Sequence, residues 1–130
     1  VAKPEWWNDE GLKALSARIV RAAPNDVAAN SIRADVLSGQ SRAWEVKPRS
    51  ATELEEAAAH FDLAAALCAA PVQKSILAGN ADWCRNQAEA MRFSTEVAAA
   101  SPSKAGAAPL LLGIALALAL AGAAVAVLVV

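Results

Sequence analysis

The sequence has few of the residues from which catalytic, metal and disulfide sites are built. Its 130 residues include one histidine, two cysteines, no tyrosine and only 5% aromatic residues. Two cysteines are too few for a disulfide-stabilised scaffold, and a lone histidine lacks the partner ligands of a zinc site. The formal net charge of -1 also lacks the basic excess that nucleic-acid-binding proteins carry, so we expect no nucleic acid partner.

Alanine is abundant where these residues are scarce. It supplies 35 of the 130 residues, and hydrophobic residues together make up 56% of the chain. Because alanine has the highest helix propensity and is depleted in strands, this composition predicts an all-α fold.

Charge is missing from the end of the chain. All lysine, arginine, aspartate and glutamate residues lie between Lys3 and Lys104, and the 21 residues 110–130 are only Leu, Ala, Val, Ile and Gly. A helix of that length measures about 30 Å, which matches the hydrocarbon core of a bilayer. We therefore predict a transmembrane helix over 110–130 and an integral, single-pass membrane protein with a C-terminal anchor. A glycolipid-anchor signal, which is removed on maturation, is the alternative interpretation.

The predicted span has a face of small residues, Gly113, Ala117 and Ala121, at four-residue spacing. Such a face lets another helix approach closely, so we expect it to pack against other membrane-protein subunits within the lipid bilayer. The span contains no histidine, amide or acidic side chain. We therefore expect no cofactor bound by side-chain ligation, and only peripheral contact with lipids or with pigments such as chlorophyll and carotenoid. Lys104 is the only charge beside the span, and it predicts that the preceding residues face the cytoplasmic or stromal side.

Residues 1–97 contain start and stop signals for four helices, which we expect to form two helical hairpins in a repeat-like soluble head. Asn8 or Asp9 is suited to cap the first helix, and Pro24 ends it. Asparagine and aspartate at 25–26 are suited to cap the second helix, and Gly39 closes it. The residues expected to face inward are Leu12, Leu15 and Ile19 in the first helix, and Val27, Ile32, Val36 and Leu37 in the second.

The third and fourth helices have equally clear signals. Thr52, followed by Glu55, predicts a capping box at the start of the third helix, and Pro71 predicts the start of the fourth. Small residues and prolines in 98–109 predict a flexible linker to the span. The residues expected to face inward are Leu54, Ala57, Phe61, Ala64 and Cys68 in the third helix, and Ile76 or Leu77, Ala81, Cys84, Ala88 and Met91 in the fourth.

The third predicted helix resembles the second helix of a tetratricopeptide repeat. Ala57, Phe61 and Ala64 have the spacing of that repeat's small, aromatic and alanine positions, and Pro71 follows two residues later than the pattern expects. The preceding loop is longer than the family's turn, and the Trp, Leu-Gly and Tyr signature of the repeat's first helix is not present. The resemblance covers residues 24–92 and implies binding of proteins rather than catalysis.

The overall pattern also resembles short repeat-like proteins of alanine-rich unicellular algae, some of which are extra subunits of thylakoid complexes. This resemblance implies a structural accessory or linker subunit of a larger membrane complex, a photosystem or its light-harvesting antenna, in the thylakoid membrane. One alternative is a tail-anchored adaptor that recruits soluble partners to a mitochondrial or endoplasmic membrane. A pigment-binding subunit is a third possibility.

Five residues are candidates for binding a protein partner. Arg42, Trp44 and Arg49 lie in the loop between the second and third helices, and Trp and Arg are enriched at binding hot spots. A solvated loop with Trp44 packed on the helices is the other interpretation. Trp6 and Trp7 are adjacent and cannot both face one core, so we expect one to cover the first helix and the other to meet a partner or a membrane surface.

No arrangement of residues indicates an enzyme. His60 has no second histidine with which to share a metal, and we expect a partly buried structural residue. Cys68 and Cys84 are separated by about 15 Å of helical rise in the expected hairpin, too far for a disulfide, so we expect two small core thiols. The glutamates at 53, 55 and 56 suit the positive end of a helix, and the sequence contains neither a nucleophile elbow nor a glycine-rich phosphate loop.

Overall fold

The structure is a computed structural model that describes residues 4–41, 43 and 46–100. Within these residues it contains four α-helices and no strand, as the composition predicted. They are α1 Asp9–Ala22, α2 Val27–Leu37, α3 Ala51–Leu67 and α4 Pro71–Ala100.

The chain divides into two compact units, Val1–Phe93 and Ser94–Val130. In the second unit, the described residues 94–100 are helical, so α4 extends three residues into the segment where a linker was predicted. The reason is the three consecutive alanines at 98–100, which are strong helix formers. None of the described helices is both long and apolar enough to cross a bilayer. The predicted span over 110–130 lies outside the described residues.

Local capping contacts fix the starts of α1 and α2 as predicted. The Asn8 side chain accepts a hydrogen bond from the N–H of Gly11, and the Asp26 side chain accepts one from the N–H of Ala29, each at 2.8 Å. Gly39 follows α2 with a φ of 79°, the left-handed conformation in which glycine commonly terminates a helix.

The start of α3 differs from the prediction by two residues. The capping box is formed by Ser50 and Glu53, not by Thr52 and Glu55. The Glu53 N–H donates to Ser50 Oγ at 3.1 Å, and the Ser50 N–H donates to Glu53 Oε1 at 3.2 Å. Both sequence patterns fit a capping box, but Glu53 also forms a 2.7 Å ion pair with Lys13 of α1, and this tertiary contact favours the earlier start.

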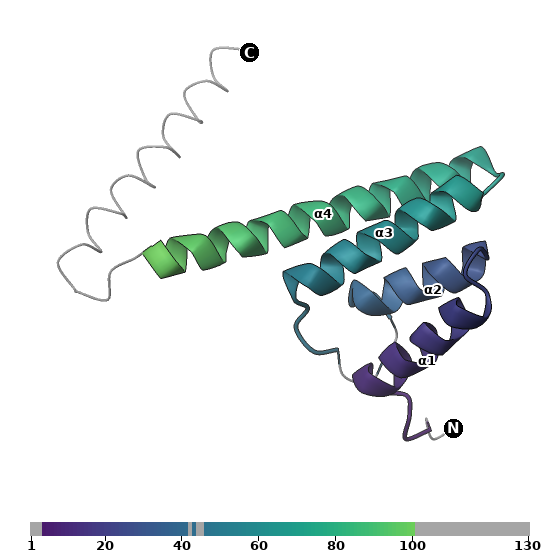
Figure 1. Cartoon of the computed structure of the whole chain (residues 1–130), viewed down its shortest axis with the longest axis horizontal. Helices are drawn as coiled ribbons and strands as arrows, with labels where there is room; N and C mark the ends of the chain where they lie inside the picture. Colours follow the sequence, from purple (N-terminus) through teal and green to yellow (C-terminus); the bar gives the residue numbers. More distant parts are fainter. Residues whose placement is uncertain (1–3, 42, 44–45, 101–130) are drawn as a thin grey trace, which may run out of the picture. The chain divides into compact units, whose positions relative to one another are not determined.

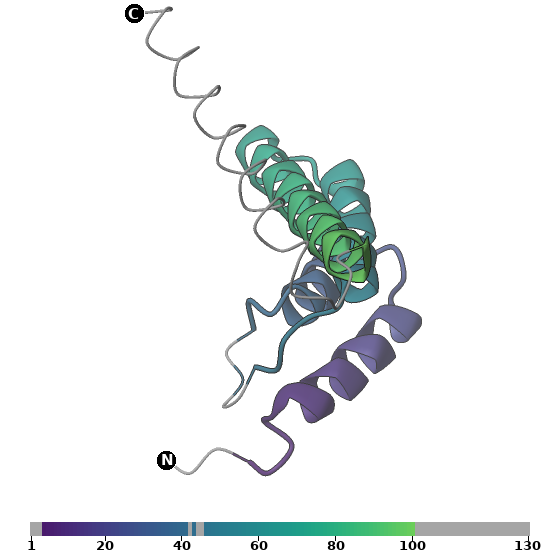
Figure 2. The ribbon, with the colours of Figure 1, turned by 90° about the vertical axis from the view of Figure 1, so that its left-hand side faces the viewer.

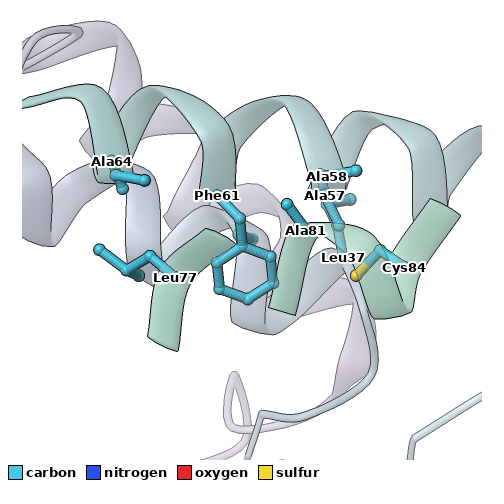
Figure 3. Packing of buried hydrophobic residues seen from close by; sticks show 10 residues of the cluster. Leu37, Ala57, Ala58, Phe61, Ala64, Leu77, Ala81 and Cys84 are labelled. Carbon is cyan, nitrogen blue, oxygen red and sulfur yellow. The ribbon is translucent and has the colours of Figure 1, made fainter. Parts of the chain in front are cut away.

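The helices follow one another in space in chain order, with α2 packed on both α1 and α3 (Figure 1). The second view shows α3 beside α4, and it shows α1 on the side of α2 that faces away from α3 and α4 (Figure 2). At the centre, Phe61 of α3 is 1% exposed and points toward Leu77 and Ala81 of α4 (Figure 3). Leu37 of α2 and Cys84 of α4 belong to the same cluster, whose other members are mainly alanine. Small residues therefore let three helices meet closely around one aromatic ring.

Two residues expected to face inward do not. Ile32 is 43% exposed, because the inward face of α2 is used by Asn30, which is fully buried, and by Arg33, which reaches both α1 and α3. Met91 is 38% exposed, and Ala88 is the last residue of α4 that is buried. Leu15 and Ile19 are only partly buried in α1, where Leu12 is buried.

Candidate functional site

One face of α4 belongs to the core of the first unit. Arginines beside this face bond to α3: Arg85 Nη1 donates to Asp62 at 2.6 Å, and Arg92 Nη2 donates to Glu55 at 2.6 Å. The later arginine of α4, Arg92, bonds to the earlier residue of α3, Glu55. The two helices are therefore antiparallel, as predicted for a hairpin. The α4 residues buried at this contact are Leu77, Ala81, Cys84 and Ala88.

The opposite face of α4 carries a row of exposed apolar and small residues with one amide among them, which we name the α4 stripe. Its positions are separated alternately by four and three residues. The large apolar side chains in the row are between 44% and 75% exposed, and none of them is buried by the described residues. The members of the α4 stripe are Val72, Ile76, Gly79, Trp83, Asn86, Ala90 and Phe93.

Gly79 occupies the middle of this row, although glycine weakens a helix. A Cβ atom at this position would meet no other atom within 4 Å, and Gly79 does not have a positive φ. Packing within the described chain therefore does not require glycine here, and alanine would be more favourable by about 1 kcal/mol. A glycine on an exposed helix face is suited to close approach by a group from outside.

The two edges of the α4 stripe differ in charge. Asp82 and Glu89 border one edge, and neutral amides border the other, at Gln73, Asn80 and Gln87. Among the described residues, Glu89 has no ion-pair partner. Arg85 bonds both Asp82 and Asp62 at 2.6 Å, so this group of three side chains keeps a net charge of -1. The stripe thus has one negative edge and one neutral edge.

Trp6 and Trp7 lie at the surface beside two different grooves. Their rings are in contact, with centroids 5.6 Å apart and planes tilted by 57°. Trp6 is half-exposed and lines a groove of about 430 Å³ along α1 with Ala14, Leu15 and Arg18. Trp7 is partly buried in a groove of about 380 Å³ between α1 and α2. Both rings therefore border helices, and contact of either with a partner stays a prediction.

Asp35 is the charged group of the groove that Trp7 lines. Burial raises the pKa of its carboxyl above the ordinary value of 3.8. No cation of the described chain lies within ion-pair distance of Asp35, so its charge is compensated by none of these residues.

Arg49 is a buried structural residue, which corrects its expected role in an exposed docking loop. Its guanidinium donates to the Asp9 carboxylate at 2.5 and 2.8 Å and to the Val36 carbonyl at 2.8 Å. Lys13 joins the cluster by pairing with Asp9 at 3.4 Å and with Glu53 at 2.7 Å. The hydrogen bond from Arg49 lowers the pKa of Asp9. This cluster ties the loop before α3 to α1 and α2, so the Arg49 side chain has no free face for a partner.

The remaining predicted site residues are not placed by the structure. Arg42 and Trp44 of the loop lie outside the described residues, as do Gly113, Ala117 and Ala121 of the predicted span.

His60 belongs to a row of polar groups between the helices. Its Nδ1 is 2.9 Å from Asn30 Oδ1, and its Nε2 is 3.8 Å from Glu56, which also bonds Arg33. Burial lowers the pKa of His60 below 6.5, so the imidazole is mostly neutral at pH 7. This partly buried structural position agrees with the prediction. In the described part of the chain, no group of three His, Cys, Asp or Glu residues is arranged to hold a metal ion.

Comparison with known proteins gives no relative. No protein-family model matches the chain, and searches of curated proteins and of solved structures find no match. The tetratricopeptide resemblance therefore stays a prediction.

The α4 stripe was not among the predicted partner-binding residues. Its signal is present in the sequence as the alternating spacing of Val72, Ile76, Gly79 and Trp83. Alanine-rich positions around the same helix give a second apolar face, however, and only that core-facing row was predicted.

Proposed function

We propose that this chain is a non-enzymatic docking subunit of a larger membrane complex. Its helical first unit binds another protein through the α4 stripe, and residues 110–130 hold the chain in the bilayer. The observation that carries the proposal is the row of large apolar side chains left exposed along one face of α4. An amphipathic helix normally buries such a row, and an exposed one marks an interaction surface.

The membrane part of the proposal rests on the sequence. Residues 110–130 are uncharged and long enough to span a bilayer, and the small face of Gly113, Ala117 and Ala121 suits close packing on a neighbouring helix. The resemblance to accessory subunits of algal thylakoid complexes makes a photosystem or its antenna the first complex to examine. In that setting, pigments would contact the span by apolar packing alone.

The test follows the tagged full chain through gentle detergent solubilisation of membranes from its source organism. We expect it to migrate with a large complex on a native gel. The double variant Trp83→Ala/Phe93→Ala should be released from the complex. Leu63→Ala, which truncates a similarly exposed side chain on α3, is the matched control and should remain bound.

Two results would contradict the proposal in separate ways. Removal of the chain from membranes by alkaline carbonate would contradict a membrane-spanning segment. Unchanged migration of the Trp83→Ala/Phe93→Ala variant with the complex would contradict docking through the α4 stripe.

A further inference from the structure

The α4 stripe has the spacing and the length of a seam between two helices. Alternating separations of three and four residues average 3.5, the repeat with which side chains of paired helices interlock as knobs into holes. From Val72 to Phe93 the row extends about 32 Å at a rise of 1.5 Å per residue. An occupant that covers the whole row is therefore a helix of about 20 residues.

The residue sizes along the stripe define what that helix must present. Trp83 and Phe93 have the bulkiest side chains of the row, whereas the row has only small side groups at Gly79, before Trp83, and at Ala90, between the two aromatic residues. A matching helix carries large side chains opposite the small side groups and small ones opposite the aromatic rings. Asn86 lies at a central seam position, where a buried amide selects one register.

A second copy of this chain fits the stripe poorly. In a parallel pair, equal positions meet, so Gly79 would face Gly79 and leave a hole while Trp83 would face Trp83. In an antiparallel pair related by a twofold axis, the same edge of both copies meets. Asp82 and Glu89 would then lie beside their own equivalents, and the like charges would repel.

A membrane surface is also a poor occupant. Helices that lie in the interface of a bilayer carry Lys and Arg beside their apolar face, because biological membranes present anionic headgroups. The edges of the α4 stripe carry acidic residues and amides instead.

We infer that the α4 stripe receives an amphipathic helix of a different protein, whose apolar seam is bordered by Lys or Arg where it meets Asp82 and Glu89. The negative edge, with Glu89 unpaired by any described residue, supplies the charge complementarity. This inference rests on the proposed function and gives the chemical character of the partner.

The experiment uses the full chain in a neutral detergent and two fluorescein-labelled synthetic helical peptides of four heptads. Both have the same leucine and alanine seam, but one carries Lys at the positions beside it and the other Glu. Neither peptide pairs well with itself, so each is a fair probe. We expect fluorescence anisotropy to show binding of the Lys peptide and about tenfold weaker binding of the Glu peptide at low salt. High salt should reduce this difference.

Variants connect the binding to named residues. Trp83→Ala and Phe93→Ala should each weaken binding of the Lys peptide, whereas Leu63→Ala should not. Glu89→Lys should lower the preference for the Lys peptide, because it reverses one charge of the negative edge. Both expectations concern exposed side chains, so the fold should be retained, and circular dichroism checks this.

Each other result overturns the inference. Equal binding of the two peptides would show that charge does not select the partner. Concentration-dependent dimerisation that Trp83→Ala abolishes would identify a second copy as the occupant. Trp83-dependent binding of the chain to vesicles containing phosphatidylglycerol, without peptide binding, would identify a lipid surface. If neither peptide binds but Trp83→Ala/Phe93→Ala still releases the chain from its complex, this inference fails and the proposed function stands.

Discussion

At the scale of single residues, Asp9 and Arg49 form a buried ion pair in which each charge depends on the other. Their side chains are 2% and 5% exposed, and the contact is bidentate. Removing one partner of such a pair leaves an uncompensated buried charge, which typically costs about 3–5 kcal/mol. An exposed pair contributes only about 0–1 kcal/mol.

We therefore expect Arg49→Met to lower the free energy of unfolding by about 3 kcal/mol or more. Lys47→Met, which removes the exposed pair with Glu10, should lower it by less than about 1 kcal/mol. The double variant Asp9→Asn/Arg49→Met should recover part of the loss, because no charge is then left buried. Urea unfolding of the full chain, followed by circular dichroism, measures all three. Similar losses for Arg49→Met and Lys47→Met would mean that the buried pair does not stabilise the fold.

The same pair predicts how stability depends on pH. Arg49 lowers the pKa of Asp9 below 3.8, so the unfolded chain takes up the proton more readily than the folded one. The stabilisation is complete above the unfolded pKa and is lost as the pH falls from about 4 through the folded pKa. We expect the urea midpoint to decrease in this range, and to decrease less in Asp9→Asn. Equal slopes in both proteins would contradict the assignment to Asp9.

At the scale of the helices, the start of α3 separates two sequence patterns that look alike. Ser50 accepts the capping hydrogen bond, whereas Thr52, the predicted cap, is the second residue of the helix. An N-cap serine replaced by alanine typically costs about 1 kcal/mol, but an exposed threonine in the first helical turn contributes little. We expect Ser50→Ala to lower the unfolding free energy by this amount and Thr52→Ala to leave it nearly unchanged. Chemical denaturation measures the loss of unfolding free energy in both variants. A larger loss in Thr52→Ala than in Ser50→Ala would support Thr52 as the helix cap instead.

The helix ends were largely predictable because their causes are local. A capping or helix-breaking residue acts within a few residues of its own position. The helix starts and ends marked by Asn8, Asp26, Gly39 and Pro71 are those that the sequence predicted. The inward face of α2 was less predictable. Ile32 has the apolar character of a core residue, but polar contacts with α1 and α3 rotate α2 so that this side chain points outward.

At the scale of the whole first unit, one ring fills the space among three helices. Among the described residues of the central cluster, Phe61 is the only aromatic one, and the residues around it are mainly alanine. Truncating a buried phenylalanine to alanine typically costs about 3–5 kcal/mol, and a domain of this size has only about 5 kcal/mol in total. We expect Phe61→Ala to leave the helical unit marginally stable, with a much lower urea midpoint and a partial loss of ellipticity at 222 nm. A variant that keeps its ellipticity and urea midpoint would show that the core does not depend on this ring.

The candidate site was harder to predict than the fold, because it depends on contacts between residues that are far apart in the sequence. Arg49 resembled an exposed loop cation, and only the folded chain shows that Asp9, 40 residues earlier, binds it. The α4 stripe has a clear spacing, but so does the core-facing row on the same helix. Spacing alone does not tell which of two apolar faces is covered, since that depends on where α3 lies.

Because the two thiols differ in burial, thiol labelling can measure how often α4 separates from α3. Both cysteines are free; Cys68 is partly accessible, and Cys84 is completely enclosed. Burial raises the pKa of Cys84 and so reduces its reactive thiolate further. In Cys68→Ser, alkylation by iodoacetamide should therefore proceed only when α4 separates from α3, and its rate, measured by intact mass, gives the frequency of that event. A helix bound on the far side of α4 would slow this labelling without touching the thiol.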